Sequence, residues 1–381
     1  MYILIISRGI PDQAEPQWGC FEKDQAEALA AIGHKVVVAS VDSRFRLTYR
    51  QFGITHRIIN GIDYYNSFLV PVALTNLLGK AFTQHVRTAQ FNRIFCRIMQ
   101  EHGKPDVILG EFVFNTVLGV EVHKKYNIPL VWIEHYSRFN NKELDPRTKF
   151  EAVTACKNTD AVIAVSSNLQ KALNRHFGIT ASIVHNTFGP EFRYAPHSVG
   201  NICHLVSVGS LFYGKGFDLL VKALADINGQ MPKWDLQIIG EGDFRPQLEQ
   251  LIDANGLKDK ISLPGRRNKQ EIAAVLQSSD CFILPSRGEN FSVAVLEALA
   301  CGCPVIASDC GDIKVCITDK NGMIFPVEDT RALEQCLLHF FEHRQDYDRE
   351  AIAADCHARF SAEVIAGQLT EILNKAVSAG K

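Results

Sequence analysis

The 381-residue sequence lacks a strong excess of charge of either sign, because 40 Lys and Arg stand against 42 Asp and Glu and the formal net charge is only −2. Such a balance gives no support for a nucleic-acid partner. The chain has no apolar run long enough to span a membrane, and its opening residues 1–9 have no basic n-region of a signal peptide. We therefore expect a cytoplasmic globular protein.

The sequence has 11 cysteines but lacks the spacing of a zinc site. Four of them occur in apolar stretches that are typical of buried thiols: Cys96, Cys156, Cys281 and Cys336. Four others lie close together without a nearby histidine: Cys301, Cys303, Cys310 and Cys316. We predict neither disulfides nor a metal site.

The length exceeds what one hydrophobic core usually serves, so two domains are expected. Residues 1–195 carry 22 Lys and Arg against 17 Asp and Glu, whereas residues 196–381 carry 18 against 25. A basic N-terminal half favours an anionic surface or substrate, although a harmless imbalance between two soluble domains explains it equally well.

Short apolar runs alternate with amphipathic stretches along the whole chain, as a parallel sheet covered by helices requires. The first half contains strand-like runs at residues 2–7, 35–40, 106–109, 130–133 and 161–165. After a turn-rich stretch at 186–200 the pattern restarts, with runs at 205–208, 236–239, 261–263, 282–284 and 304–307, and residues 361–378 form a last helix. Two doubly wound α/β domains are predicted.

Two glutamates eight positions apart, Glu289 and Glu297, stand where a strand, a glycine-containing turn and a helix follow each other. A helix N-terminus offers unpaired amides to an anion, and a carboxylate one turn further can accept hydrogen bonds from ribose hydroxyls. Two acidic residues at a fixed offset also arise by chance.

Other loops after predicted strands carry polar groups that such a site could use. Lys215 lies in the glycine-rich turn 209–218 before a helix, where an ammonium group could neutralise a phosphate. His135 follows a strand in the first half and could bond a substrate hydroxyl. Taken singly, a Gly/Lys turn is more often only a turn, and a loop histidine is more often structural or merely exposed.

Together these residues resemble a family of enzymes, the family 4 retaining glycosyltransferases of the GT-B fold, also called glycosyl transferases group 1. The specific match is residues 289–302, with Glu289, Phe291, Glu297, Ala298, Ala300 and Gly302 in the family's Glu-x-Phe-Gly-x-x-x-x-Glu-Ala-x-Ala-x-Gly pattern. Further resemblance lies at Gly33-His34-Lys35-Val36, at Asn186 and at Pro304–Ala307, so it runs nearly end to end.

The resemblance implies a fold and a domain plan. It implies two Rossmann-like domains facing across a cleft, with an acceptor-binding domain at residues 1–195 and a nucleotide-sugar-binding domain at 196–358. A C-terminal helix at 359–381 would pack back on the first domain. It also implies a hexosyltransferase that retains anomeric configuration and uses a nucleotide-sugar donor, UDP- or GDP-linked, without a metal or other cofactor.

The resemblance also implies roles for individual residues. Glu289, His135 and Lys215 would form the catalytic group, and Glu297 would bind the donor ribose. The remaining donor contacts would be Gly19, Ser210, Lys215, Arg266, Arg267, Asn290, Phe291, Ser292 and Val293. Two positions depart from the family: Ser210 stands where an arginine beside the phosphate is usual, and Ser292 replaces a glycine that follows Phe291. These departures bear on the donor's identity more than on the fold.

The acceptor is expected to be a glycan or a lipid-linked glycan, as in cell-surface polysaccharide or lipopolysaccharide synthesis. Basic and apolar residues mix in the segments 44–50 and 77–99, which suggests attachment to an anionic membrane at its inner face, although an amphipathic core helix also explains 77–99. Two other functions remain open: a sugar-nucleotide epimerase of the same architecture, and a non-catalytic subunit that binds nucleotide-sugar.

Overall fold

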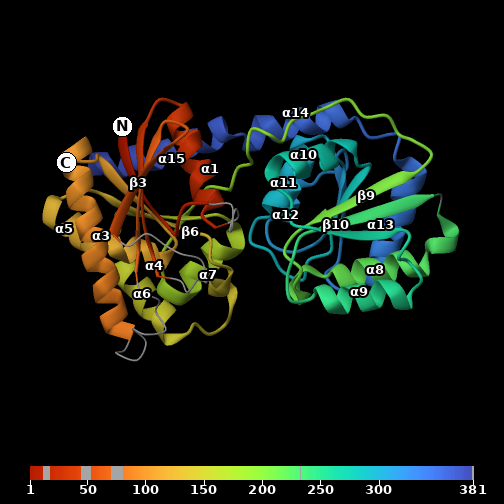
Figure 1. Ribbon diagram of the computed structural model, residues 1–381, viewed down its shortest axis with the longest axis horizontal. Helices are drawn as coiled ribbons and strands as arrows, with labels where there is room; N and C mark the ends of the chain where they lie inside the picture. The colour runs from red at the N-terminus through yellow and green to blue at the C-terminus, as the bar shows by residue number, and fades with distance from the viewer. Residues whose placement is uncertain (12–17, 44–52, 70–79, 232, 380–381) are drawn as a thin grey trace. The chain divides into compact units, whose positions relative to one another are not determined.

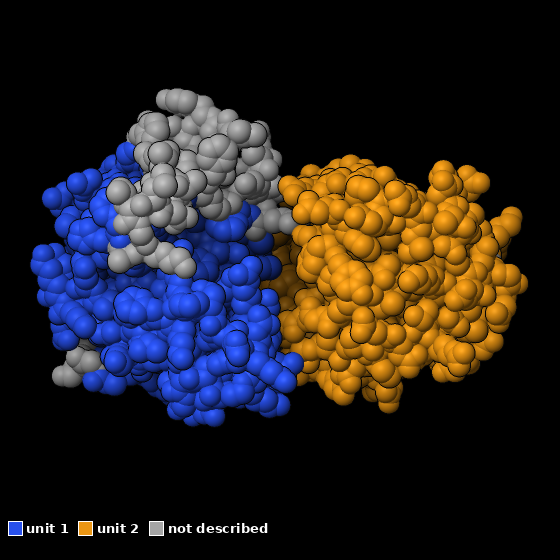
Figure 2. Space-filling model, turned by 90° about the horizontal axis from the view of Figure 1, so that it is seen from below, with its two compact units in different colours: residues 1–186, 362–381 blue, residues 187–361 orange. Residues whose placement is uncertain are grey.

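The computed structural model describes residues 1–11, 18–43, 53–69, 80–231 and 233–379 (Figure 1). By contacts the chain divides into two compact units, which Figure 2 shows in blue and orange. Unit 1 comprises Met1–Asn186 and Ala362–Lys381, and unit 2 comprises Thr187–Ser361. Residues 187–195, placed in the N-terminal domain by the sequence prediction, therefore group with unit 2. The acceptor-binding and donor-binding roles of the two domains stay predictions.

Unit 1 contains an eight-stranded sheet in the order β3-β4-β2-β1-β5-β6-β7-β8. All neighbouring strands pair in parallel except β3 and β4. The central strands are buried along their whole length, which explains why they appear in the sequence as continuous apolar runs. The strands are β1 Tyr2–Ser7, β2 Lys35–Asp42, β3 Gly53–Ile59, β4 Ile62–Phe68, β5 Val107–Glu111, β6 Leu130–Glu134, β7 Ala161–Ala164 and β8 Ser182–Ile183.

Helices pack on both faces of this sheet and form two cores. One face is covered by α1, α6, α7 and the C-terminal α15, and the other by α3 and α5. The helices are α1 Cys20–Ala31, α3 Lys80–His102, α4 Val113–Thr116, α5 Val120–Tyr126, α6 Pro146–Cys156, α7 Ser167–Phe177 and α15 Ala362–Ala379. The amphipathic stretch predicted at 77–99 is α3 from residue 80 onward, and its Phe91, Ile94, Phe95 and Ile98 are core residues.

The hairpin β3–β4 was not predicted from the sequence. β3 is an edge strand whose residues are exposed or half-buried, so it has no apolar run that would identify it. A turn signal was present, since Asn60 and Gly61 join the two strands with φ values of 51° and 79°. Asn-Gly favours this two-residue hairpin turn because both residues tolerate positive φ.

Unit 2 contains a six-stranded, all-parallel sheet in the order β11-β10-β9-β12-β13-β14. One face is covered by α8, α9 and α13, and the other by α10, α11, α12 and α14 (Figure 1). The strands are β9 Cys203–Val208, β10 Trp234–Ile239, β11 Ile261–Gly265, β12 Cys281–Leu284, β13 Val305–Ser308 and β14 Gly322–Phe325. The helices are α8 Phe217–Asp226, α9 Arg245–Ala254, α10 Lys269–Ser278, α11 Val293–Ala300, α12 Ile313–Cys316, α13 Thr330–His343 and α14 Arg349–Phe360.

The last helix, α15, belongs to unit 1 although it follows unit 2 in the chain. Its apolar stripe includes Ile365, Leu369 and Leu373, all buried in the core that also contains α1. His34, just after α1, bonds Thr370 through Nε2 at 2.8 Å. The C-terminal helix therefore completes unit 1. The parallel sheets with helices on both faces confirm the doubly wound α/β fold that was predicted for both halves.

The cysteines are more varied than their sequence context suggested. Cys281 is buried as predicted, but Cys156 and Cys336 are only partly buried. The prediction for Cys96 was wrong, because this residue lies on an exposed face of α3, whose buried face is formed by its neighbours Phe95 and Ile98. Over the described part of the chain there is no helix long and apolar enough to cross a membrane.

Candidate functional site

The predicted donor residues of unit 2 lie in the loops that follow β9, β11 and β12, except Val293 and Glu297, which belong to α11. β9 and β12 are neighbours, and their carboxyl ends meet at one edge of the parallel sheet. Ligands of such sheets bind at this edge, next to the amino ends of the helices that follow. The loop after β9 carries Ser210 and Lys215, and the loop after β12 carries Glu289.

Lys215 and Glu289, which are 74 positions apart in the sequence, meet in a direct ion pair. The Lys215 Nζ lies 2.5 Å from Glu289 Oε1, and the Ser286 hydroxyl donates to the same oxygen at 2.8 Å. Their side chains are only 19% and 12% exposed. A partly desolvated pair of this kind is stronger than a surface salt bridge, so both groups have fixed positions.

The helix predicted after the glycine-containing turn is α11, which begins four residues after Glu289. Its N-cap residue Ser292 makes no side-chain capping bond, so the first amides of α11 are not capped by that hydroxyl. Asn290, Phe291 and Ser292 are buried in the segment that leads into the helix. Glu297 is half-buried about one turn further along. The positive end of the α11 dipole therefore lies at the end of the loop after β12. The Lys215 ammonium comes from the loop after β9, the neighbouring strand.

Ser210 is exposed, and two described arginines of unit 2, Arg245 and Arg287, are bound to other groups. Arg245 donates to Glu241, Glu249 and the Leu263 carbonyl. Arg287 is bound to Asp218 and Glu328. Lys215 is thus the cation that the structure places beside Glu289.

Arg266 and Arg267, predicted to flank the nucleotide base, lie in the loop after β11 and are both exposed. Arg267 Nη1 lies 3.6 Å from Glu271, a contact along the start of α10. β11 is separated from β9 by β10, so these arginines are on the same edge as Lys215 but two strands away.

In unit 1, Gly19 forms the N-cap of α1 with φ of 80°. A Cβ at this position would stand 2.3 Å from the Gly9 carbonyl oxygen. Only glycine allows the loop after β1 to approach the start of α1 this closely. The structure therefore places a backbone without a side chain at a helix N-terminus. That Gly19 contacts the donor phosphates stays a prediction.

His135 lies directly after β6, and its Nε2 is 2.7 Å from Glu111 Oε2 at the end of β5. Both side chains are almost fully buried. Burial raises the pKa of the Glu111 carboxyl, although the hydrogen bond and the charge of His135 oppose that shift. Phe112, with a strained φ of 62°, places its ring 4.8 Å from the His135 ring. Backbone strain of this kind concentrates at functional sites.

Glu134 precedes His135 and is a buried carboxylate that the sequence analysis did not single out. It accepts from the amides of Val113, His135 and Tyr136 and from the Trp132 indole, at 2.7 to 3.1 Å. Burial raises its pKa, and these hydrogen bonds oppose the shift. By holding the backbone of residues 135 and 136, Glu134 fixes the loop that presents His135.

Arg8 and Glu22 form a second ion pair that was missed from the sequence. Arg8 Nε and Nη2 donate to the two Glu22 oxygens at 2.7 and 2.9 Å, and the Arg8 guanidinium lies 4.2 Å from the Phe112 ring centre. Burial alone would raise the pKa of Glu22, but the hydrogen bonds and charge of Arg8 lower it. The positions of three of these charged residues in the sequence could have identified them, because Arg8, Glu111 and Glu134 each occur at the end of a buried strand.

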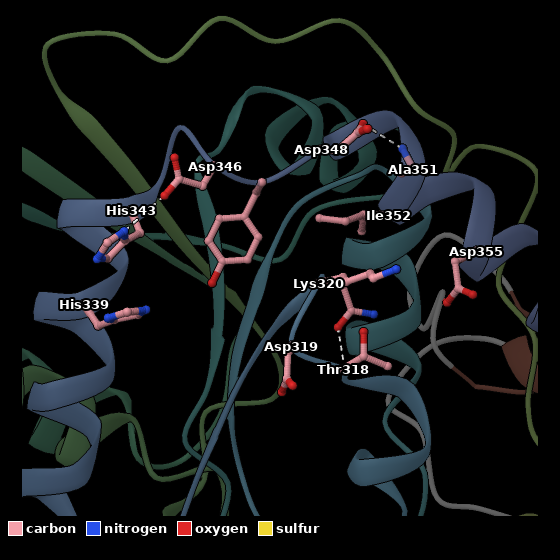
Figure 3. A pocket seen from close by; sticks show the side chains of 12 residues that line it. Thr318, Asp319, Lys320, His339, His343, Asp346, Asp348, Ala351, Ile352 and Asp355 are labelled. Atoms are coloured by element: carbon pink, nitrogen blue, oxygen red, sulfur yellow. Dashed lines mark hydrogen bonds and ion pairs between the residues drawn. The ribbon is translucent and has the colours of Figure 1, made fainter.

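Unit 2 also contains a cavity of about 970 Å³ that none of the predicted site residues lines. Figure 3 shows His339 and His343 of α13 on one side of it and Asp355 of α14 on the other. The loop 318–321, which lines the cavity, precedes β14 and so lies at the amino ends of the strands. This cavity is therefore at the edge opposite to Lys215 and Glu289. Among the described residues no group of three or more His, Cys, Asp or Glu could hold a metal ion.

Two family models match successive parts of the chain. The model described as Glycosyltransferase Family 4 matches residues 23–191, and the one described as Glycosyl transferases group 1 matches residues 202–354. The chain belongs to this family of glycosyltransferases, as the sequence resemblance predicted. The fold, with one Rossmann-like unit under each model, is the two-domain GT-B fold.

Curated relatives support the same assignment. The D-inositol 3-phosphate glycosyltransferase of Arthrobacter sp. is 30% identical over 269 residues, which are 63% of this chain and 62% of the relative. The putative colanic acid biosynthesis glycosyltransferase WcaL of Escherichia coli is 29% identical over 198 residues, 48% of each chain. The matched region is thus less than two thirds of the length of these relatives.

Solved structures share the fold along nearly the whole chain. Sucrose-phosphate synthase from Thermosynechococcus elongatus superposes with a TM-score of 0.78 at 18% identity, covering 99% of both chains. Anabaena HepE, solved with UDP and glucose, has a TM-score of 0.73 at 18% identity, covering 98% of this chain and 99% of HepE. At this identity the likeness concerns the fold.

Proposed function

We propose that this protein is a retaining glycosyltransferase that moves a hexose-type sugar from a nucleotide-diphosphate sugar to a hydroxyl of a glycan or lipid-linked acceptor, without a metal ion. The observation that carries the proposal is the Lys215–Glu289 pair at the carboxyl edge of the unit 2 sheet. Glu289 lies four residues before α11 begins. That HepE was solved with UDP supports a nucleotide-linked donor.

The donor diphosphate would lie against Lys215 and the amides of residues 290–293. A departing diphosphate carries developing negative charge, and an ammonium group together with a helix N-terminus stabilises that charge in the transition state. Glu297 would accept hydrogen bonds from the ribose hydroxyls. Ser210 would donate a neutral hydrogen bond where relatives of the family use arginine.

In the proposed step the acceptor oxygen attacks the anomeric carbon from the face that the diphosphate leaves. The bond from the anomeric carbon to the acceptor oxygen forms, the bond to the phosphate oxygen breaks, and the departing phosphate takes the acceptor proton. Glu289 would face the transferred sugar near the anomeric centre. His135, held by Glu111, would contact a hydroxyl of the same sugar.

The product is proposed to be a cell-surface polysaccharide or lipopolysaccharide. The relative named for colanic acid biosynthesis supports this class of acceptor.

Peripheral attachment to an anionic membrane belongs to the same proposal. Unit 1 carries Phe150, 70% exposed on α6, next to the exposed Lys149. An apolar ring beside a cationic group suits the interface of an anionic bilayer. The basic segment 44–50 lies outside the described residues.

A thermal-shift screen against UDP, GDP, ADP and their hexose conjugates tests the proposal. A ligand present at about 100 times its dissociation constant stabilises the folded state by about 2.7 kcal/mol, which raises the melting temperature measurably. We expect one nucleotide and its sugar conjugates to give such a shift. If none of the compounds shifts the melting temperature and none is consumed in the presence of glycan acceptors, the proposed function is wrong.

A further inference from the structure

Arg287, which the sequence analysis did not single out, connects three separate segments of unit 2. Its Nη1 and Nη2 donate to the two carboxylate oxygens of Asp218, each at 2.9 Å. Its Nε donates to Glu328 Oε1 at 2.9 Å, and Nη1 also donates to the Tyr213 carbonyl at 2.6 Å. A guanidinium group has five N–H donors in a rigid plane, so these four bonds use most of its capacity.

The Asp218 end of this contact is protected from water. The side chains of Arg287 and Asp218 are 13% and 12% exposed. The Tyr213 ring lies over the guanidinium with its centre 3.8 Å away. A two-pronged arginine–carboxylate bond that is partly desolvated fixes direction as well as distance. The hydrogen bonds to Asp218, together with its charge, raise the pKa of Arg287, so the group stays charged.

The segments joined in this way carry the two charged groups of the proposed donor site. Asp218 lies in the first turn of α8, three residues after Lys215, and Arg287 precedes Glu289 by two. The backbones are joined as well, since the Arg287 amide donates to the Gly214 carbonyl at 2.8 Å. The contact between Arg287 and Asp218 therefore joins the segments that carry Lys215 and Glu289.

We propose that Arg287 is a positioning residue of the transfer reaction: by binding Asp218 and Tyr213 it holds the turn 213–218 against the loop 286–289, so that Lys215 and the start of α11 are arranged for a diphosphate before the donor arrives. This inference rests on the proposed function. The position of Lys215 at the diphosphate matters more in this chain because Ser210 supplies no second cation there. A diphosphate that meets one cation loses most when that cation is displaced.

The conservative variant Arg287→Lys tests the proposal. Lysine keeps the charge but has no planar fork, so it cannot bond both oxygens of Asp218 and the Tyr213 carbonyl in the same geometry. Asp218→Asn is a second variant, which keeps the size of the acceptor and removes its charge. Arg359→Lys is the matched control, because Arg359 of α14 also bonds a carboxylate, Asp355, and a backbone carbonyl, that of Val315.

Hydrogen exchange of the ligand-free protein is the first measurement. Both test variants should speed exchange of the amides in residues 211–217 while leaving exchange in the rest of unit 2 close to wild type. The control should leave residues 211–217 unchanged. Unchanged exchange in Arg287→Lys overturns the positioning role whatever the protein binds.

Calorimetric titration with UDP, GDP and ADP is the second measurement. For the nucleotide that binds wild type, Arg287→Lys should raise the dissociation constant at least about tenfold and lower kcat/KM by about 100-fold, the loss expected from a displacement near 1 Å. In a Lys215→Ala background the same change should have little further effect, because Arg287 acts through Lys215.

The outcomes separate the two claims. If wild type binds none of the three nucleotides, the proposed function fails and hydrogen exchange alone decides the positioning role. If wild type binds and Arg287→Lys binds equally well, the positioning role fails and the proposed function stands. An equal loss with and without Lys215 also contradicts the proposal, because it means that Arg287 does not act through that lysine.

Discussion

At the scale of single residues, the Lys215–Glu289 pair bears most of the proposed chemistry. Lys215→Ala removes the ammonium group that would face the diphosphate, and preorganised charges of this kind contribute about 10²- to 10³-fold to turnover. We expect kcat to fall by that factor with the melting temperature little changed. Lys258→Ala is the control, since Lys258 pairs with Asp253 on the surface of the same unit. Near wild-type turnover in Lys215→Ala would show that Lys215 has no such role.

Glu289→Gln separates the charge of Glu289 from its shape. The amide keeps one oxygen for the Ser286 hydroxyl but cannot pair with Lys215 as an anion. We expect transfer to fall by orders of magnitude, as for Glu289→Ala, while nucleotide binding stays within a few-fold, because Lys215 is then free to meet the phosphate. Steady-state kinetics and titration of the same preparation measure the two effects. Glu249→Gln, at an exposed glutamate of α9, should change neither.

The Arg8–Glu22 pair predicts a pH-dependent contribution to stability in unit 1. The lowered pKa of Glu22 means that its ionised form is favoured in the folded state. The stabilisation is therefore full above the ordinary glutamate pKa of about 4.3 and is lost as the pH falls through the lower folded value. Removing one partner of a buried pair costs about 3 kcal/mol, so Glu22→Gln should unfold at lower urea at pH 7.

The comparison of urea midpoints at pH 7 and pH 4 checks this sign. The difference in urea midpoint between wild type and Glu22→Gln should be largest at pH 7 and should become smaller toward pH 4 and below. A gap that is constant across this range would mean that the charge of Glu22 does not contribute, and that the variant is destabilised only through packing.

At the scale of elements, the turn before α8 is held against the end of β12 by a glycine. Gly216 has φ of 68°, and a Cβ there would stand 1.9 Å from the Pro285 carbonyl oxygen. Gly216→Ala should therefore push the turn that carries Lys215 away from the loop that carries Glu289. We expect a lower melting temperature and at least about tenfold weaker nucleotide binding.

Gly229→Ala is the matched control for this prediction. Gly229 lies in the same unit, in a short 3-10 turn, and a Cβ there would meet no atom within 4 Å. Melting curves and titrations of the two variants side by side give the answer. Equal behaviour of Gly216→Ala and Gly229→Ala would contradict the close contact between the two loops.

Elements with strong sequence patterns were predicted well, and contacts between distant segments were not. The helix predicted after the glycine-containing turn at Glu289 is α11, and α10 begins with a local signal, the Asn268–Glu271 capping box. Local side chains determine such helix ends. By contrast, the edge strand β3 has an irregular burial pattern and was missed.

The same limit applies to the candidate site. The motif around Glu289 and Glu297 was visible because all its members are close in sequence. The ion pairs Lys215–Glu289 and Arg287–Asp218 join residues about 70 positions apart. These ion pairs form because β12 lies beside β9 in the sheet. A single sequence gives no direct signal of the order of the strands.

At the scale of the whole molecule, the uneven charge of the two halves predicts where the protein meets a membrane. The first 195 residues hold the basic excess, and α6 of unit 1 exposes Phe150. We expect binding to vesicles containing phosphatidylglycerol at low ionic strength, with release at high salt because the attraction is screened. Phe150→Ser should weaken binding, and Val315→Ser of unit 2 should not. Failure of wild type to float with anionic vesicles at low salt would refute membrane association.

The proposed function requires a donor site in unit 2 that is centred on Lys215. The measurement that tests it most directly is calorimetric titration of the wild-type protein and Lys215→Ala with UDP, GDP and ADP. We expect one nucleotide to bind wild type at a single site, and Lys215→Ala to bind it at least about tenfold more weakly with an unchanged melting temperature. Equal affinity of both proteins for that nucleotide would contradict it.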